Sequence, residues 1–330
     1  MNVCGIDVDS REVKVVIRAN SANGKLQVFK NSPTEHQRLA TLLRRSGVDR
    51  VCLEATGVYH LDLALALHAE PGLEVMVLNP KAARRFAEAL SERQKTDKVD
   101  AQVLAQFAER MPFSPWQPPR DEALSLRLIA RRLATLVNQR TRAKNQLHAA
   151  KASQCTPAVV REDIELTTDQ LERQIQRLRD AALELIAADT QMSEALELVT
   201  SLKGVAMASA IQLLGELLVL PEDMGPKQWT AMAGLDPRHH QSGSSERKTS
   251  ISKAGNAYLR QALYMPALSA SRHEPHVAAF KNHLVENKGL KKIQAIVAVM
   301  RKLLHAIYGM LRTRTPFDGT RFRALPETAT

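Results

Sequence analysis

The sequence predicts an N-terminal α/β domain, an antiparallel helical hairpin and a mostly α-helical C-terminal domain. Three observations support this division. Strand-like and helix-like segments alternate over residues 1–111, four prolines fall within residues 112–119, and heptad repeats follow over residues 120–190. The C-terminal domain then covers residues 191–320, and a tail of residues 321–330 is expected to lack structure. The 330 residues suffice for two or three domains with real cores.

The charge of the chain is strongly positive and unevenly distributed. The net charge is +11 with a pI near 9.7, and residues 201–330 hold 18 lysines and arginines against 9 acidic residues. A polyanionic partner, most simply nucleic acid, is therefore expected to contact the C-terminal part. Only 4% of the residues are aromatic, which argues against reading single strands mainly by base stacking.

Cysteine usage and hydropathy favour a cytoplasmic protein without a membrane partner, and the expected nucleic-acid partner would make it nucleoid-associated. Cys4 and Cys52 lie in apolar segments and are expected in the core, and the odd number with Cys155 favours reduced thiols. The longest apolar run, residues 208–220, contains Glu216 and is shorter than the roughly 18 residues that a membrane span requires. No charged-then-apolar leader is recognised.

The N-terminal domain is expected to begin with three strands joined as hairpins. Residues 2–9 form an apolar run interrupted by Asp7, residues 12–19 alternate, and residues 26–30 form a short strand after a polar turn. Helices and strands then alternate. The pattern predicts a helix over 32–47, a strand over 49–57, a helix over 58–69, a strand over 73–79, a helix over 80–90 and a further helix starting within 95–107. This order predicts a mixed sheet with helices on its faces.

The first of these helices carries sequence signals at both ends. Ser32 is the expected N-cap, Pro33 occupies the first turn, and Glu35 would complete a capping box. Gly47 is expected to end the helix.

The predicted hairpin consists of two heptad-patterned arms joined near residues 153–160. The apolar positions are Leu126, Ile129, Leu133, Leu136, Ala143 and Leu147 in the first arm, and Leu171, Ile175, Leu178, Ala182 and Leu185 in the second. Spacings of three and four residues are typical of coiled coils. The arms therefore predict an antiparallel pair, which could also support oligomerisation.

The C-terminal domain is predicted to consist of short helices around a polar loop. Residues 201–214 resemble a helix-hairpin-helix, whose turn amides can hold a backbone phosphate, although Ala206 replaces the usual second glycine. A purely structural turn is the alternative. The polar loop covers residues 239–250, and residues 256–271 and 291–312 form amphipathic helices with basic faces.

Four acidic residues on three predicted elements are candidates for a metal site. Asp7 interrupts an apolar strand, and a buried lone carboxylate needs a partner such as a cation. Glu54 ends another strand, where open α/β sheets commonly form sites. Asp97 and Asp100 are three positions apart, so both can face one point from the start of a helix. Together these acids would suit one or two Mg²⁺ (or Mn²⁺) ions.

Each acid also has a simpler interpretation. Asp97 follows Thr96 and could be a helix N-terminal acid stabilised by the dipole, with Lys95 and Lys98 as charged neighbours. Asp7 could pair with Lys14. Glu54 could be an ordinary surface glutamate.

The segments that carry these acids resemble a known family. "GIDVDS" (5–10), "LEATGVY" (53–59), Asn79-Pro80 and "KTDKVDA" (95–101) resemble the N-terminal domain of DEDD transposases, the Piv-invertase-like, bridge-RNA-guided recombinases of insertion sequences. The resemblance implies a ribonuclease H-like (RuvC-type) fold, whose strand and helix order agrees with the order above. It also implies that the family's four acids correspond to Asp7, Glu54, Asp97 and Asp100.

A second set of motifs resembles the C-terminal transposase domain of the same family. The set comprises Gly-Leu-x-Pro-Arg at 234–238, Ser-Gly-Ser-Ser at 242–245 and Ser-Lys-x-Gly-Asn-x-x-Leu-Arg at 252–260. The resemblance implies that Ser242 is the nucleophile and forms a 5′-phosphoserine intermediate. Ser244 and Ser245 are competing choices, and a solvated loop is the plain alternative. His239 and His240 are candidate bases or phosphate ligands, or only loop contacts.

The resemblance implies a DNA recombinase of an insertion sequence that cuts and rejoins donor and target double-stranded DNA through a Holliday junction. It implies a non-coding bridge RNA as guide and a homodimer or homotetramer. The candidate nucleic-acid contacts are Arg238, Arg247, Lys248, Lys253, Arg260, Lys291, Lys292, Arg301 and Lys302, and Arg312 and Arg314 extend the same basic stripe. The alternatives are a metal-dependent nuclease of the junction-resolvase type with water as nucleophile, and a non-catalytic nucleic-acid scaffold. A kinase of the actin-like fold is disfavoured because its second phosphate loop is not found.

Overall fold

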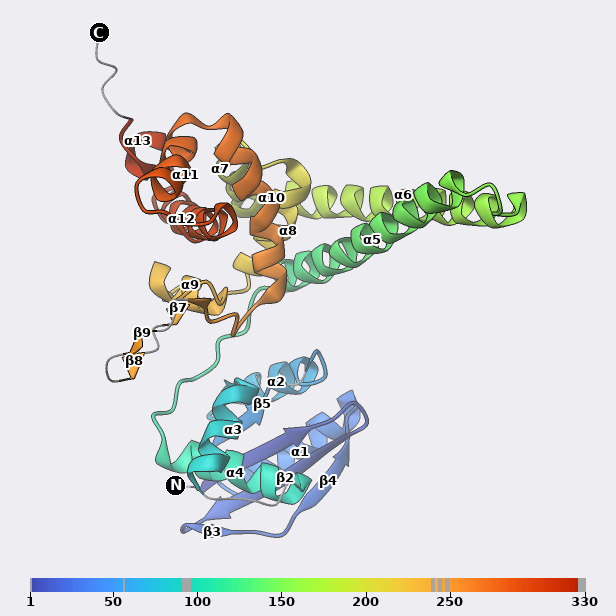
Figure 1. The fold of residues 1–330 in the computed structure, drawn as a ribbon. Helices are drawn as coiled ribbons and strands as arrows, with labels where there is room; N and C mark the ends of the chain where they lie inside the picture. The colour runs from blue at the N-terminus through green and yellow to red at the C-terminus, as the bar shows by residue number, and fades with distance from the viewer. Residues whose placement is uncertain are drawn as a thin grey trace. The chain divides into compact units, whose positions relative to one another are not determined.

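The computed structural model describes residues 2–55, 57–90, 96–238, 241–242, 245–246 and 250–325, and of residues 238, 241, 242, 245 and 246 it describes the backbone alone. The chain divides into two units, Met1–Pro118 and Pro119–Thr330. In Figure 1 the first unit carries the blue end of the colour scale, and the second runs from green to red.

A mixed sheet forms the centre of the N-terminal unit. Its strands are β1 (Asn2–Val8), β2 (Glu12–Ala19), β3 (Ala22–Asn23), β4 (Gln27–Lys30), β5 (Val48–Glu54) and β6 (Glu74–Leu78). The spatial order is β3-β2-β1-β5-β6, with β4 also paired to β2. β2 runs antiparallel to β1, whereas β5 and β6 run parallel to it, so β1 and β5 end at the same edge of the sheet.

Helices cover both faces of this sheet, as the sequence predicts (Figure 1). They are α1 (Pro33–Arg45), α2 (Leu61–His68), α3 (Pro80–Ala89) and α4 (Asp97–Arg110). Because strand side chains alternate between faces, Ile6 packs in one core with residues of α1 and α2, while Val3 packs in another with residues of α3 and α4. Cys4 and Cys52 are fully buried, which confirms that they are core residues.

The predicted start of α1 is correct, but its predicted capping box is wrong. Ser32 is the N-cap in an extended conformation, yet its side chain makes no capping hydrogen bond. Glu35 instead pairs with Arg38 at 2.5 Å. A surface ion pair one turn away therefore replaces the reciprocal cap, and Gly47, at φ +59°, follows the helix end. The next helix, α2, begins at Leu61, three residues later than predicted.

Gly5 allows α4 to lie directly against β1. A Cβ atom at Gly5 would lie 2.1 Å from the carbonyl oxygen of Ala101 and 2.3 Å from the amide nitrogen of Ala105. We therefore expect Gly5→Ala to destabilise the N-terminal unit by about 1–3 kcal/mol or more, because backbone must move to make room. Urea denaturation followed by circular dichroism measures the change.

Gly309 provides a control of opposite sign for this substitution. It lies within α12 (Lys292–Thr313), and a Cβ atom there would meet nothing within 4 Å. Gly309→Ala is expected to stabilise its helix by about 0.5–1 kcal/mol. Equal midpoints for Gly5→Ala and wild type would show that α4 does not depend on this close contact.

The C-terminal unit is mostly helical. Its elements are α5 (Asp121–Ala152), α6 (Ala158–Ala187), α7 (Thr190–Ser201), α8 (Met207–Leu217), α9 (Pro226–Met232), β7 (Pro237–Arg238), β8 (Gln241–Ser242), β9 (Ser245–Glu246), β10 (Ser250–Ile251), α10 (Ala257–His273), α11 (Pro275–Glu286), α12 and α13 (Gly319–Phe322).

The helices α5 and α6 form the predicted antiparallel hairpin. Lys144 of α5 pairs with Glu172 of α6, and Lys151 of α5 pairs with Glu165 of α6, both at 2.7 Å. Because the later residue of α5 pairs with the earlier residue of α6, the two helices run in opposite directions. Figure 1 shows the far end of the hairpin extending away from the other helices of this unit. The near end of α5 shares a core with α8 and α12, to which Leu126 contributes.

The turn between α7 and α8 packs closely against α10. The turn between α7 and α8 brings Gly204, at φ +115°, against α10, where an added Cβ would lie 2.5 Å from the amide nitrogen of Ala270. This packing favours a structural turn.

Among the described helices, α12 has the length and composition of a membrane span, but Val299, Leu303 and Ile307 are fully buried in the core. It is the central helix of this unit.

Candidate active site

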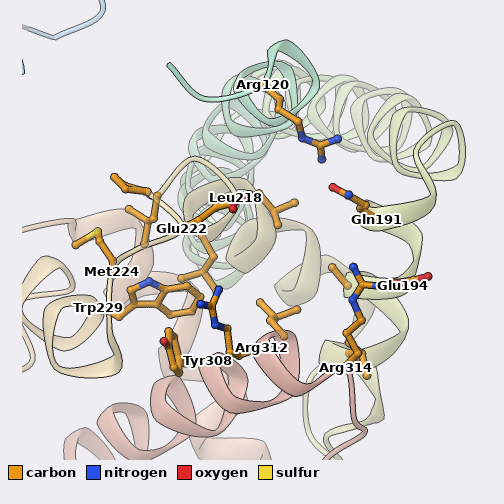
Figure 2. A pocket seen from close by; sticks show the side chains of 16 residues that line it. Arg120, Gln191, Glu194, Leu218, Glu222, Met224, Trp229, Tyr308, Arg312 and Arg314 are labelled. Carbon is orange, nitrogen blue, oxygen red and sulfur yellow. Dashed lines mark ion pairs between the residues drawn. The ribbon is translucent and has the colours of Figure 1, made fainter. Parts of the chain in front are cut away.

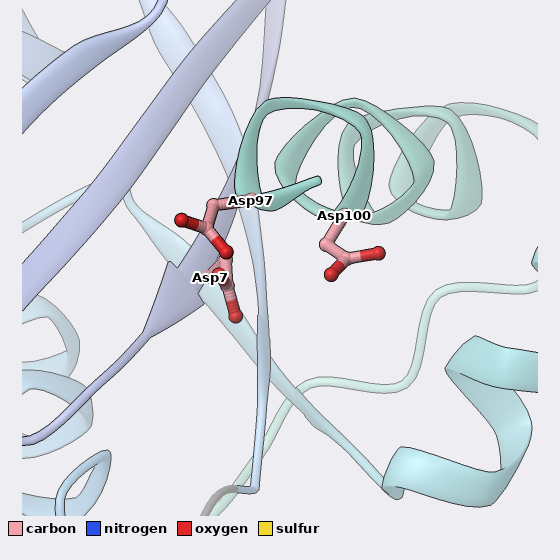
Figure 3. Close-up of side chains that lie close together, drawn as sticks. All are labelled: Asp7, Asp97 and Asp100. Atoms are coloured by element: carbon pink, nitrogen blue, oxygen red, sulfur yellow. The ribbon is translucent and has the colours of Figure 1, made fainter. Parts of the chain in front are cut away.

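Three acidic side chains meet where β1 and α4 come together. Asp7 is the penultimate residue of β1, and α4 begins at Asp97 with Thr96 as its N-cap. One carboxylate oxygen each from Asp7, Asp97 and Asp100 lies within 4.8 Å of the others. Figure 3 shows Asp97 and Asp100 projecting from the first turn of α4 toward the side on which Asp7 lies. This upper limit is no more than about twice a metal–oxygen distance of roughly 2.0–2.6 Å, so the three oxygens lie near enough to share one divalent ion.

The cluster concentrates the negative charge of three carboxylates at one place. Burial, together with the nearby charges of Asp100 and Asp97, raises the pKa of Asp7 to about 6, while Lys14 opposes the rise. Asp7 and Asp100 are half-buried and Asp97 is exposed, and carboxylates that repel one another at such close range are costly unless a cation joins them. The electrostatics therefore favour a bound divalent cation.

Lys14 is an unexpected member of this cluster. It lies opposite Asp7 in the β1–β2 register, as the simple interpretation of Asp7 required. Its ammonium group nevertheless donates to the carboxylate of Asp97, and this hydrogen bond is the main cause of its raised pKa. Asp97 is thus both a first-turn acid and a member of the cluster, so the two interpretations of that residue do not exclude each other.

Glu54 lies at the same edge of the sheet but outside the three-acid group. It ends β5, whose Leu53 is the register partner of Ile6 in β1. Among the described residues, the acids close enough to share an ion are Asp7, Asp97 and Asp100. The placement of Glu54 on the adjacent strand is compatible with a role beside them, and that role is a proposal.

Asn31 joins the segments that follow the two acid-bearing strands. Its side-chain nitrogen donates to the carbonyl oxygen of Asp9 at 2.8 Å and to that of Tyr59 at 3.1 Å. Its side-chain oxygen accepts from Nε2 of His36 at 2.7 Å. His36 is 2% exposed, and burial lowers its pKa. Because the amide oxygen of Asn31 only accepts, Nε2 of His36 carries the proton of this bond. Sequence reasoning missed Asn31, because nothing in a post-strand asparagine indicates partners 22 and 28 residues away.

The serine loop has a backbone of two short ladders. β7 pairs with β10, and β8 pairs with β9, in which Ser242 and Ser245 are register partners. Beyond the outer ladder, Ser252 donates to the carboxylate of Asp236 at 2.5 Å. Several predicted residues of interest lie outside the described residues, namely Lys95, His239, His240, Ser244, Arg247 and Lys248, and the side chains of Arg238, Ser242 and Ser245 do too.

A buried ionic network anchors the end of this loop. Asn256 caps α10 and donates to Glu216 at 2.6 Å. Glu216 is 2% exposed and accepts two hydrogen bonds from Arg131 of α5, at 2.6 and 3.0 Å. The bidentate ion pair therefore joins α5 to α8, and the hydrogen bond from Asn256 ties the start of α10, after the loop, to that pair. The sequence shows Glu216 only as a charge within an apolar run.

The predicted nucleic-acid contacts divide into exposed and internally engaged residues. Lys253, Lys291, Lys292 and Arg301 are exposed. Arg260 donates to the carbonyl oxygens of Ala233 at 2.9 Å and Gly255 at 3.3 Å, so it braces the backbone near the loop.

Lys302 is the second internally engaged residue. Its ammonium lies 4.4 Å from the ring centre of Phe280 and 4.9 Å from that of Phe322, and burial lowers its pKa. Cation–π contacts within the unit therefore occupy this side chain.

A cavity of about 370 Å³ lies elsewhere in the C-terminal unit (Figure 2). Trp229 meets the ring of Tyr308 edge-on at 5.1 Å, and leucines line much of the remaining wall. Two of its arginines are already paired, Arg120 with Asp189 at 2.7 Å and Arg314 with Glu194 at 3.8 Å. Those charges hold neighbouring elements together, and we assign this cavity no ligand.

Comparison with known proteins gives consistent matches. Residues 4–151 match a transposase family (DEDD_Tnp_IS110), and residues 196–282 match the transposase IS116/IS110/IS902 family. The pilin gene-inverting protein of Moraxella bovis is 32% identical over 275 residues, covering 81% of each chain. The transposase for insertion sequence element IS1111A of Coxiella burnetii is 24% identical over 267 residues, covering 73% of this chain and 72% of that one. A Thermus thermophilus RuvC structure in complex with a Holliday junction substrate aligns to 35% of this chain and 99% of its own, at 18% identity and a TM-score of 0.27.

Proposed function

The chain belongs to the IS116/IS110/IS902 family of transposases, and on this premise we propose that it is a metal-dependent DNA recombinase of an insertion sequence. The observation that carries the chemical part is the cluster of Asp7, Asp97 and Asp100. Carboxylates gathered from a strand end and a helix start are the donor set that Mg²⁺ or Mn²⁺ prefers. The sheet order, with β2 antiparallel and β5 parallel to β1, supports a ribonuclease H-like assignment of the N-terminal unit.

In the proposed reaction the acidic cluster would hold a divalent ion for the cleavage of the scissile phosphodiester. A bound Mg²⁺ would supply Lewis-acid polarisation of the phosphoryl oxygens. Asp7, Asp97 and Asp100 would provide oxygen ligands, with Glu54 beside them on β5. Lys14 keeps the Asp97 carboxylate in place through its hydrogen bond.

Ser242 is the proposed nucleophile. Its hydroxyl oxygen would bond to phosphorus as the bond from phosphorus to the 3′ oxygen breaks, leaving a 5′-phosphoserine and a free 3′ hydroxyl. The proton of the serine would pass to a base, and the 3′ oxygen would take up a proton. Because the phosphodiester energy is kept in the serine ester, the reverse attack by another 3′ hydroxyl can rejoin strands without ATP. Exchange between two duplexes in this way yields a Holliday junction.

The proposed partners are donor and target duplex DNA and a non-coding bridge RNA that pairs with both. The surplus of positive charge in residues 201–330 supports a nucleic-acid partner. A homodimer or homotetramer is also proposed, and the heptad-patterned hairpin of α5 and α6 is compatible with it.

A reconstituted recombination reaction tests the proposal. The protein is expressed with the flanking non-coding sequence of its element, and co-purified RNA is sequenced. With matching donor and target plasmids we expect recombinant junctions in Mg²⁺ and none in EDTA. RNase treatment before the DNA is added is expected to abolish them. Junction formation after RNase treatment would contradict RNA guidance and leave the recombinase chemistry standing, whereas junction formation in EDTA would contradict the metal site.

A further inference from the structure

A cleft of about 330 Å³ lies between α10, α11 and α12 in the C-terminal unit. Three cationic side chains and two neutral polar ones line it, together with one acid and several apolar residues. The polar and charged residues are Ser271, Arg272, Lys281, Asn282, Glu286 and Lys292. The cleft thus combines hydrogen-bond donors with positive charge in one concave surface.

Ser271 indicates that this cleft takes a ligand. The residue is 4% exposed, and its hydroxyl oxygen has no hydrogen-bond partner among the described residues. Buried hydroxyl groups in native proteins nearly always have a partner, and an orphan commonly marks the place of a missing ion, water or ligand. A serine inside a helix usually bonds the preceding turn, so this unpaired hydroxyl is informative.

The charges around Ser271 favour an anion. Arg272, Lys281 and Lys292 take part in no ion pair among the described residues, whereas two of the arginines at the larger cavity of Figure 2 are paired. Lys292 is also the first residue of α12, a helix of 22 residues with no acidic residue in its first turn. The side chain of Gln294 accepts from the backbone nitrogen of Lys291, and the N-cap residue Lys291 makes no side-chain capping bond itself. The positive end of the helix dipole adds to the same field.

We propose that the cleft binds a phosphodiester group of a nucleic-acid backbone. Arg272, Lys281 and Lys292 would pair with its non-bridging oxygens, and the Ser271 hydroxyl would donate a hydrogen bond to one of them. Lys288 and Lys291 are exposed in the connection to α12 and extend the positive surface beyond the cleft. This extension suits a polymer better than a single small anion. The identity of the polymer rests on the proposed function, but the phosphate site does not.

Binding measurements with two nucleic acids test the site. Fluorescence anisotropy gives the affinity of the full-length protein for a 30-base-pair DNA duplex and for an RNA hairpin, from 0.05 to 0.3 M salt. The double variant Arg272→Gln/Lys281→Gln is expected to weaken binding roughly 10- to 100-fold and to reduce the slope of log affinity against log salt by about 2. Ser271→Ala leaves the charge unchanged and is expected to weaken binding roughly 2- to 10-fold without changing that slope.

A matched charge control separates the effect of the cleft on binding from the effect of the protein's overall positive charge. Arg321 is 76% exposed and paired with Asp318 outside the cleft, so Arg321→Gln removes one charge there. Inorganic phosphate is the second probe. At constant ionic strength it is expected to raise the melting temperature of the wild type and of Arg321→Gln more than that of Ser271→Ala.

The outcomes are decisive in both directions. Selective weakening by the cleft variants in the DNA arm, the RNA arm or both supports the site and shows which polymer occupies it. If Ser271→Ala matches the wild type in both probes, or if the loss per charge equals that of Arg321→Gln, the proposal is overturned. Recombination by the wild type is measured on the same preparation, so failure of the proposed function is recorded separately from failure of the phosphate site.

Discussion

Asp7→Asn is expected to abolish DNA cleavage and recombination while the protein stays folded. The substitution removes a carboxylate oxygen from the group of Asp7, Asp97 and Asp100, whose ligand atoms lie within 4.8 Å of one another. Losing about 4 kcal/mol of charge stabilisation in the transition state lowers the rate roughly 10³-fold. Cleavage of a labelled duplex in Mg²⁺ measures the rate, and calorimetric titration with Mn²⁺ measures the expected loss of metal affinity.

The same substitution is expected to change the pH dependence of stability in a defined direction. The pKa of Asp7 is raised to about 6 from its ordinary value of 3.8. Between these values the folded protein binds a proton that the unfolded chain does not, so stability increases as pH falls through about 6. In EDTA, the melting temperature of Asp7→Asn should therefore exceed that of the wild type at pH 7.5, and the difference should shrink by pH 5.

Asp9→Asn is the matched control for both measurements. Asp9 is exposed, lies two residues further along, and uses its carboxylate to accept from the backbone nitrogen of Ser10 at 2.5 Å. The chemical change is identical, but the side chain is outside the three-acid group. Full cleavage by Asp7→Asn would contradict the role of Asp7 in a catalytic metal site, and equal losses in both variants would show that general negative charge is what matters.

The elements around this site were accessible from sequence because local patterns dictate them. Alternating apolar residues predict β2, and the apolar run broken by Asp7 predicts β1. The strand–helix order then requires parallel pairing of β1 with β5, which places Asp7 and Glu54 at one edge. The i, i+3 spacing of Asp97 and Asp100 puts both on the first turn of α4. Each of these steps depends on periodicity or topology, which a single sequence contains.

The parts that could not be predicted depend on contacts between distant side chains. Lys14 bonds Asp97 across 83 residues, and Glu216 bonds Arg131 across 85. No local signal distinguishes such a lysine from one that pairs with its strand neighbour Asp7. Lys302 has the spacing of a basic stripe, yet the rings of Phe280 and Phe322 draw it into the unit. Amphipathic patterns give the face of a helix but not what covers it.

Ser242→Ala is expected to eliminate a covalent protein–DNA adduct and to reduce cleavage to below about one thousandth of the wild-type rate, because the alanine has no oxygen to attack phosphorus. The adduct is trapped by denaturing the reaction with detergent and separating protein-bound label on a gel. A duplex labelled on the 5′ side of the break should lose no label to the protein, and one labelled on the 3′ side should transfer it. Tryptic mass spectrometry then locates the phosphoserine.

Ser244→Ala and Ser245→Ala are chemically identical controls in the same loop. Ser245 is the register partner of Ser242 in the β8–β9 ladder, so its replacement perturbs the same ladder without removing the proposed nucleophile. Both controls should keep the adduct at Ser242. Cleavage by Ser242→Ala without any adduct would mean that water attacks, as in a metal-dependent nuclease of the junction-resolvase type. Mn²⁺ affinity makes the assignment specific, since Ser242→Ala should retain it and Asp7→Asn should lose it. A protein that binds the ion yet forms no adduct has lost the nucleophile alone.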